Sequence, residues 1–426
     1  MAFRVRTDRR VDEQLAPAEA PAAAAPSVGL LAPLGHRDYR WALGGRFFSL
    51  TGDFAQSVIL AVLVLDITQR PSGWGTLLTV QAVPRVLLML IGGVAVDRFQ
   101  ARTVMLASNL LQALALAALL GWSLLDGIEL AHLYAYAVVS GVAFAFFLPA
   151  SQSIVPELLP REQIRGGNAL WLMAFNLARF IGPPVVGTLV AVAGHAAALA
   201  ATVAMFLLGA AALGPIHGRP STRASGSPLA QMREGLQAAR QDKAVWAIIL
   251  LAAVYNFGNA AATFVGLPTL AKLELGAGDQ GVGILYGALG AGALVGALAT
   301  GLVAGIPRQG VVGAITNFGG GLPLVAAALM PTIWTAVPLL VVAGAFQSAG
   351  GVIFLTLVQT RTPPEVRGRV MALLSLSLFG LTPLAYAVGG LLGDVLGPRG
   401  VLAAGGAAII LTGLILLSYK AVRDVE

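Results

Sequence analysis

Cysteine is absent from the 426 residues, and charged side chains make up only 11% of them. The missing cysteine excludes disulfides, thiol catalysis and cysteine-ligated metal sites. Ordinary soluble domains carry roughly 25% charged residues, so this chain cannot cover a soluble surface. Hydrophobic residues make up 57% instead. This composition predicts a polytopic membrane protein.

Twelve continuous apolar stretches run along the chain, each about 20 residues long, which is the length that crosses a bilayer as a helix. They begin near Trp41, Gly75, Thr103, His132, Asn168, Ala196, Ala244, Gly281, Val311, Trp334, Val370 and Gly400. The sequence therefore predicts an all-α membrane protein with twelve transmembrane helices.

The basic residues predict the orientation of these helices. Most of the 27 lysines and arginines fall in the N-terminal region, the even-numbered connections or the C-terminus, and only Arg70, Lys272 and Arg399 fall in the other connections. Because cytoplasmic loops carry the excess of positive charge, both termini are expected in the cytoplasm and the chain in the cell membrane. The net charge of +7 is thereby explained without nucleic acid.

A long polar connection divides the spans into two groups of six. The predicted parts are a disordered tail over residues 1–40, a six-helix bundle over 41–216, a linker over 217–243, a second bundle over 244–420 and a C-terminal tail over 421–426. Arg165-Gly166 before the fifth span is echoed by Arg367-Gly368 before the eleventh. Two pseudo-symmetric halves of this kind are typical of secondary transporters.

The connection after the second span, GGVAVDRFQAR, contains Gly92, Gly93, Asp97, Arg98 and Arg102. It resembles the loop signature of the major facilitator superfamily, although Gln100 and Ala101 depart from it and the second half has Gly305 where an acid would stand. The resemblance implies the major facilitator fold, with Asp97 docking near the start of the eleventh span. Asp97→Asn is then expected to cripple transport without preventing insertion. The alternative is an ordinary topogenic loop.

Further segments narrow the resemblance. HRDYRWALGGRFFSLTGD from His36 and PPEVRGRVMALLSLSLFGLTPL from Pro363 are similar to the branch with bacterial enterobactin exporters and macrolide efflux pumps. That resemblance implies a monomeric, cofactor-free and metal-free secondary transporter that exports hydrophobic or amphipathic small molecules by proton antiport. Gly182, Pro183 and Gly187 of the fifth span are similar to the motif of drug:proton antiporters, although glycine and proline are also common in membrane helices.

Ionisable groups inside a span are functional candidates because they are expensive to bury in lipid. At 1.5 Å per residue, Asp53 lies about 18 Å into its span, near the midplane. It is the candidate for proton coupling, with Arg46, Arg85 and Arg179 as charge partners. A purely architectural ion pair is the alternative. Two midplane arginines against one aspartate favour a neutral or anionic ligand over a cation.

Polar and aromatic residues within the spans are candidates for lining a substrate cavity. They are Gln56, Gln81, Trp171, Phe175, Asn176, Tyr255, Asn256, Asn259, Phe346 and Gln347. Each can instead serve as a contact between helices, but as a set they favour a bulky amphipathic ligand.

Two other functions were compared with export. A membrane-embedded enzyme is disfavoured, because none of the four histidines falls at a midplane and no carboxylate pair does, which leaves no acid–base machinery. A facilitator or importer of the same fold remains open, because direction depends on coupling rather than on architecture.

Overall fold

The computed structural model describes residues 29–125, 127–217, 228–302 and 308–423. These residues are overwhelmingly helical, as lipid demands, because a helix satisfies its backbone hydrogen bonds internally. Nine helical stretches of the described part are long and apolar enough to cross a membrane. The prediction of an all-α membrane protein is confirmed.

The N-terminal half is built from five long helices. They are α1 (Arg37–Thr68), α2 (Pro71–Arg98), α3 (Ala101–Leu124), α4 (Leu130–Leu158) and α5 (Ile164–Leu213), with short 3₁₀ turns η1 (Ala32–Gly35) and η2 (Arg161–Gln163). Helix α1 is buried along most of its length and packs chiefly against α5. It therefore forms the centre of this half.

The C-terminal half follows a linker helix, α6 (Pro228–Gln241), which lies within the predicted linker. Its first span is α7 (Lys243–Ala260), continued by π-helical η3 (Ala261–Gly266), α8 (Leu267–Thr269) and π-helical η4 (Leu270–Glu274). The rest are α9 (Gly278–Leu302), α10 (Gln309–Ala328), α11 (Ile333–Arg361), α12 (Pro364–Phe379), α13 (Thr382–Ser418) and α14 (Lys420–Arg423).

Two glycines break the longest helices. Gly194 in α5 has φ 82° and Gly397 in α13 has φ 72°, a backbone conformation that favours glycine because it lacks a Cβ. The break divides α5 into the fifth and sixth predicted spans. The eleventh span consists of α12 and the part of α13 before Gly397, and the rest of α13 is the twelfth. The nine stretches, together with α2 and the two additional spans that the breaks create, make the twelve spans that the sequence predicts. Each predicted start lies within a few residues of the observed one.

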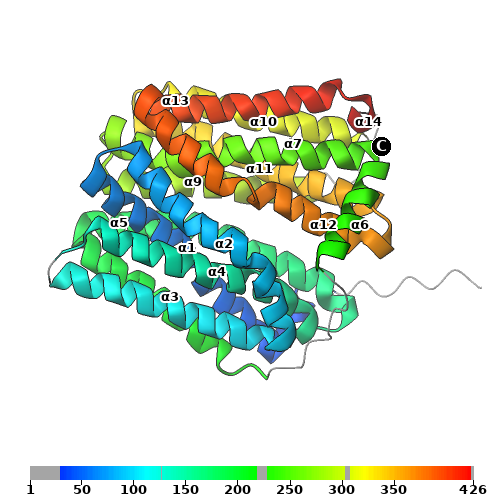
Figure 1. Cartoon of the computed structure of the whole chain (residues 1–426), viewed down its shortest axis with the longest axis horizontal. Helices are drawn as coiled ribbons and strands as arrows, with labels where there is room; N and C mark the ends of the chain where they lie inside the picture. Colours follow the sequence, from blue (N-terminus) through cyan, green and yellow to red (C-terminus); the bar gives the residue numbers. More distant parts are fainter. Residues whose placement is uncertain (1–28, 126, 218–227, 303–307, 424–426) are drawn as a thin grey trace, which may run out of the picture.

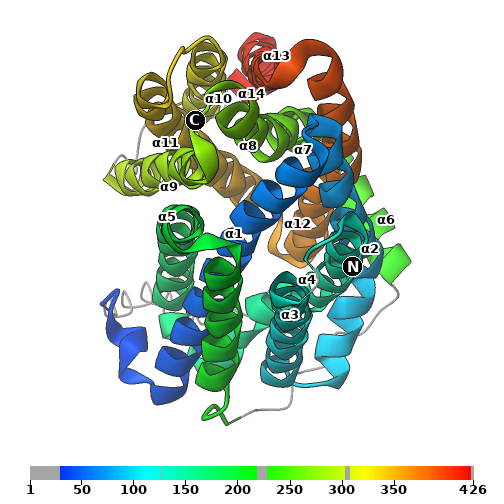
Figure 2. The ribbon, with the colours of Figure 1, turned by 90° about the vertical axis from the view of Figure 1, so that its left-hand side faces the viewer.

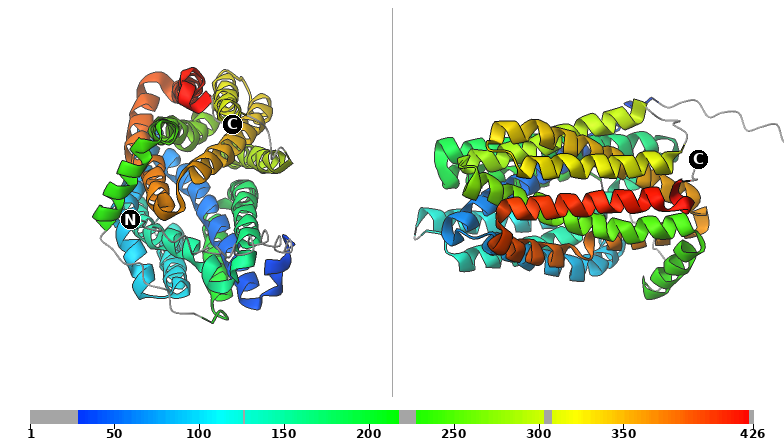
Figure 3. Two further views of the ribbon diagram at one scale, coloured as in Figure 1. Left: turned by 90° about the vertical axis from the view of Figure 1, so that its right-hand side faces the viewer. Right: turned by 90° about the horizontal axis from the view of Figure 1, so that it is seen from above.

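The two halves lie side by side with their helices roughly parallel (Figure 1). Helix α6 and the last described residues lie at one end of the bundle, which we call the linker end; the opposite end is the far end. Seen from the far end, α5 and α9 face each other across the boundary between the halves (Figure 2). Within the C-terminal half, α13 packs along α7 and α10 (Figure 3).

One predicted boundary is wrong. The sequence predicts a disordered tail over residues 1–40, but η1 and the start of α1 fall within 29–40. Tyr39 is fully buried and donates a hydrogen bond of 2.7 Å to the carbonyl of Gly167. This aromatic anchor ties the segment to α5. Residues 1–28 of the predicted tail lie outside the described part.

Candidate functional site

Asp53 lies inside the N-terminal half within a network of neutral polar side chains. Its Oδ1 accepts hydrogen bonds from Gln56 Nε2 at 3.2 Å and from Gln112 Nε2 at 3.4 Å. The side chains around it come from α1, α3, α4 and α5. Asp53 nevertheless retains partial exposure. A carboxylate held only by amide donors can gain or lose a proton without breaking an ion pair.

The network continues away from Asp53 through one tyrosine and one serine. The hydroxyl of Tyr136 bonds the amide oxygens of both Gln56 and Gln112. Ser140 Oγ accepts from Gln56 at 3.4 Å and from Gln81 at 2.9 Å. The structure thus brings the predicted residues Asp53, Gln56 and Gln81 into one cluster.

Sequence analysis missed Gln112, Tyr136 and Ser140 in this cluster. The available signal was their polarity, because each interrupts an apolar span. Only the packing of α3 and α4 against α1 shows which of the many polar residues in the spans meet at Asp53.

The three predicted charge partners do not form ion pairs with Asp53. Among the described residues, no arginine lies within ion-pair distance of its carboxylate. Arg46 Nη1 donates instead to Ser151 Oγ at 2.9 Å, and its guanidinium stacks 4.7 Å from the Trp171 ring. The guanidinium carbon of Arg85 lies 3.7 Å from the centre of the Phe144 ring. Arg46 and Arg85 therefore contact aromatic rings through cation–π interactions rather than the Asp53 carboxylate.

The fifth-span motif lies at the boundary between the halves. A Cβ at Gly283 of α9 would collide with the carbonyl oxygen of Pro183, and one at Gly187 would lie 3.0 Å from the Cα of Gly283. Gly182 faces α1, where a Cβ would lie 3.1 Å from the Thr51 carbonyl. Small residues let the backbones approach closely, so this motif sets the contact between α5 and α9.

A corresponding contact joins α2 to α13. A Cβ at Gly75 would lie 2.8 Å from the Cα of Gly390, and Thr79 Oγ1 donates to the Pro383 carbonyl at 3.2 Å. Pro183 and Pro383 follow the corresponding connections of the two halves. The close packing of α5 on α9 is therefore matched by the close packing of α2 on the first part of α13, which belongs to the eleventh span.

Polar contacts between the halves lie towards the far end. Lys272 Nζ is 2.6 Å from Asp66 Oδ1, and Ser72 N donates to Asp394 Oδ1 at 3.0 Å. Trp74 Nε1 donates to the Phe264 carbonyl at 2.6 Å within π-helical η3. The Thr79–Pro383 hydrogen bond lies further along α2, and in the described part of the chain no hydrogen bond or ion pair joins the halves nearer the linker end than this. The structure is therefore closed at the far end.

The loop signature between α2 and α3 is only partly described. Gly92 packs so tightly on α4 that a Cβ would collide with the Ala145 carbonyl, whereas Gly93 faces open space. Arg102 donates to the carbonyls of Leu213 at 2.8 Å and Gly214 at 2.6 Å, which caps the C-terminal end of α5. Arg98 lies 5.7 Å from the Phe99 ring. The side chain of Asp97 lies outside the described residues, so its docking remains a prediction.

The predicted cavity residues of the C-terminal half do not converge on one site. Asn256 donates to the Leu378 carbonyl, and Asn259 accepts from Thr263 at 3.2 Å. Phe346 packs on Gly319, and the amide of Gln347 is buried without a partner among the described residues. In the other half, Trp171 and Asn176 are buried, and Phe175 packs edge-on to Phe54 with ring centres 5.5 Å apart. Most of these residues join helices.

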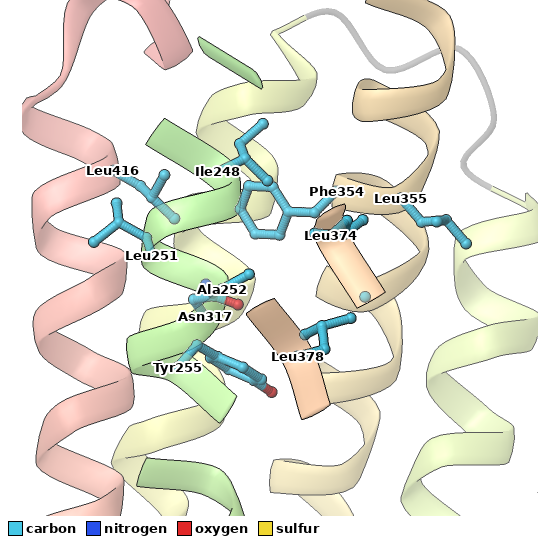
Figure 4. A pocket seen from close by; sticks show the side chains of 11 residues that line it. Ile248, Leu251, Ala252, Tyr255, Asn317, Phe354, Leu355, Leu374, Leu378 and Leu416 are labelled. Atoms are coloured by element: carbon cyan, nitrogen blue, oxygen red, sulfur yellow. The ribbon is translucent and has the colours of Figure 1, made fainter. Parts of the chain in front are cut away.

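Tyr255 of that group lines a cavity. The cavity has a volume of about 190 Å³ and lies inside the C-terminal half, between α7, α10, α11, α12 and α13 (Figure 4). Its lining is otherwise apolar apart from Asn317 and consists of Ile248, Leu251, Ala252, Gly351, Phe354, Leu355, Leu374, Leu378 and Leu416. Tyr255 was a predicted cavity residue and the other lining residues were not, because leucines in a membrane helix give no signal of their own; that this cavity binds substrate stays a prediction.

Comparison with known proteins places this architecture in a family. The family described as "Transmembrane secretion effector" matches residues 28–426. The chain belongs to this family of major facilitator transporters. Its partners are therefore the lipid bilayer and a small-molecule substrate, and it is a transporter of the cell membrane rather than an enzyme. The predicted superfamily and the prediction that the chain is not an enzyme are both confirmed.

Individual relatives agree with the family. The chain is 25% identical over 403 residues to proteins named "Multidrug efflux pump Tap" from Mycobacterium tuberculosis H37Rv and Mycobacterium bovis BCG, over 88% of this chain and 91% of each relative. A POT family transporter in complex with 5-aminolevulinic acid has TM-score 0.72 at 14% identity, over 90% of this chain and 96% of that one. A second POT structure, with a thioalcohol-conjugated peptide, has TM-score 0.70 at 14% identity, over 89% and 96%. The two structures show the shared fold.

Proposed function

We propose that the protein exports hydrophobic or amphipathic small molecules across the cell membrane in exchange for protons. The observation that carries the proposal is the site of Asp53, a carboxylate deep in the N-terminal half that is held by the amides of Gln56 and Gln112 rather than by an arginine. The name of the mycobacterial relatives, multidrug efflux pump, supports the direction and the class of substrate. Both termini then lie in the cytoplasm, and one copy of the chain suffices.

Alternating access supplies the mechanism. The far end is closed by the contacts between α5 and α9 and between α2 and α13, and by the ion pair of Lys272 with Asp66. Rocking of the halves breaks these contacts and opens the far end. Because α1 carries both Asp53 and Asp66, the same helix connects the proton site to the closing contacts.

Proton coupling requires that Asp53 binds protons differently in the two states. In this closed state the amides favour the charged carboxylate; separation of α3 from α1 would remove the Gln112 amide and favour protonation. A hundredfold difference in proton affinity between the states corresponds to about 2.7 kcal/mol of coupling.

Reconstituted vesicles test this proposal. Wild-type protein is expected to concentrate substrate when only a pH difference is imposed, whereas Asp53→Asn retains binding and passive exchange but loses accumulation. Accumulation by Asp53→Asn equal to that of the wild type would refute Asp53 as the coupling site.

The direction of substrate transport is tested in cells that carry or lack the protein. Loss of an exporter raises the substrate retained by the cell, and a protonophore has the same effect. Loss of an importer lowers it. Reporter fusions after residue 230 and at the C-terminus check the orientation, because an external reporter at either position contradicts it.

A further inference from the structure

Two arginines of the N-terminal half face the C-terminal half and form no ion pair within the described residues. Arg85 of α2 lies 3.7 Å from the Phe144 ring on its own side and 5.6 Å from the Phe379 ring of α12 across the boundary. Arg179 of α5 has Tyr255 and Tyr286 of the C-terminal half as its electrostatic neighbours. Both arginines remain partly exposed.

Within the described residues, neither guanidinium donates a hydrogen bond or forms an ion pair, although the charge of Asp53 acts on Arg85 from a longer distance. The acids of the boundary are engaged at the far end, where Asp66 and Asp279 pair with Lys272, and Asp394 accepts from Ser72. Asp53 is held by glutamines inside its own half. An arginine offers five donors in a fixed fork, so both guanidiniums keep hydrogen-bond donors available for an anionic group.

An apolar cavity adjoins these charges. Tyr255 neighbours Arg179 and also lines the cavity of about 190 Å³ in the C-terminal half. Leu378 lines the same cavity (Figure 4). The next residue, Phe379, has its ring centre 5.6 Å from the guanidinium carbon of Arg85. Neither arginine lines the cavity itself, but each lies next to its wall from the opposite half: Arg179 through Tyr255, and Arg85 through Phe379, which follows the lining residue Leu378.

We infer that the transported substrate is an amphipathic anion, whose carboxylate or sulfonate is bound by Arg179 in the field of Arg85 and whose apolar body enters the cavity beside Tyr255. The inference rests on the proposed export function and specifies its substrate class. It excludes cationic dyes, which two unpaired arginines repel. An arginine fork prefers a planar carboxylate or a tetrahedral oxyanion over a neutral hydroxyl.

A matched pair of fluorescent probes tests the inference. 8-Anilinonaphthalene-1-sulfonate carries a sulfonate, whereas N-phenyl-1-naphthylamine has the same aromatic body without charge. Binding is measured on purified protein in neutral detergent with no gradient imposed. Arg179→Gln and Arg85→Gln are each expected to raise the Kd of the sulfonate at least tenfold and to change that of the neutral probe less than twofold.

Three variants control this experiment. Arg179→Lys keeps the charge and retains most sulfonate affinity, and Arg165→Gln, at the exposed start of the same helix, changes neither Kd. Leu374→Trp fills the cavity and weakens both probes. Equal losses for both probes in Arg179→Gln and Arg85→Gln, or unchanged sulfonate binding, would overturn the inference.

The outcomes also separate this inference from its rivals. If phosphatidylglycerol in nanodiscs displaces the sulfonate but a free aromatic carboxylate does not, the site binds a lipid headgroup and the small-molecule inference is wrong. If binding depends on the arginines but neither probe is moved by a pH difference, the proposed export function is wrong and the anion inference stands. If the neutral probe is exported in preference to the sulfonate, the anion inference is wrong and the export function stands.

Discussion

Lys272 of the C-terminal half places its Nζ 2.6 Å from Oδ1 of Asp66 in the N-terminal half and also pairs with Asp279 at the start of α9. His195, which follows the break in α5, has its Nε2 3.6 Å from Asp66 Oδ2. We call these four residues the far-end ion cluster. One lysine thus neutralises two acids and joins the end of α1 to the C-terminal half.

Removal of this lysine should favour opening at the far end. In Lys272→Gln, Asp66 and Asp279 lose their shared cation and repel each other. Ion pairs of this exposure contribute up to about 1 kcal/mol, so we expect the open state to rise by about twofold to fivefold. The absence of native cysteine lets one reporter, Thr79→Cys at the boundary with Pro383, measure this as a faster reaction with maleimide.

The exposed Lys420→Gln is the control for lost charge, and Asp66→Lys combined with Lys272→Asp should restore slow labelling. Labelling that is equally slow in Lys272→Gln would mean that the helix packing alone keeps the far end closed.

The sequence predicted the spans well but could not predict the far-end ion cluster. Apolar length decides where a helix lies in the bilayer, and that signal is local. Lys272 and Asp66 lie in different halves and are far apart in the sequence. Each stands at the end of a span, where charged residues are common and give no special signal. Only the approach of the two halves brings them together. Phe346 shows the same limit. The sequence predicts it as a cavity residue, and only the packing of the helices shows that its ring lies on Gly319.

Packing at the α5–α9 boundary gives a second prediction. Alanine at Gly283 places a methyl group against the Pro183 carbonyl, and overpacking of this kind typically costs about 1–3 kcal/mol. We expect Gly283→Ala to lower the melting temperature of the purified protein. Gly44→Ala is the matched control, because a Cβ there meets nothing within 4 Å and should be neutral or stabilising by about 0.5–1 kcal/mol. Equal behaviour of the two variants would contradict a tight boundary.

Asp242, outside the membrane-spanning segments, provides a pH-dependent prediction. Its side chain caps α7 by accepting from Ala244 N at 2.8 Å and Val245 N at 3.2 Å, and it accepts from Arg361 Nε at 2.8 Å. Partial burial alone would raise the pKa of Asp242, but the hydrogen bond from Arg361 and those from the backbone outweigh it and hold the pKa below its ordinary value of 3.8.

A lowered pKa in the folded state means that the charged carboxylate stabilises the fold above the ordinary pKa, and that this contribution is lost as pH falls below about 4. Asp242→Ala should therefore lower the stability by about 1 kcal/mol at pH 7 and by less at pH 3. Thermal unfolding at both values measures the difference. An equal loss at the two pH values would show that Asp242 acts by packing rather than by its charge.

Tyr136 gives the last prediction, because its hydroxyl fixes the two glutamines that hold Asp53. The hydroxyl bonds the amide oxygens of Gln56 and Gln112, which leaves the amide nitrogen of each directed at the Asp53 carboxylate.

In Tyr136→Phe this orientation is lost, so either amide can rotate and withdraw its donor. A hydrogen bond to a charged group is worth about 1.5–3 kcal/mol, and 1.36 kcal/mol equals a tenfold change in proton affinity. If even half of one such bond is lost, the charged form of Asp53 is disfavoured, and the midpoint of the transport–pH profile should move by about half to one pH unit towards higher pH. Tyr134→Phe on the same helix, where no hydrogen bond of the hydroxyl is described, should leave the midpoint in place. A lower rate at an unchanged midpoint in Tyr136→Phe would mean that the tyrosine supports only the packing of α4, and that proton exchange at Asp53 does not depend on its amide donors.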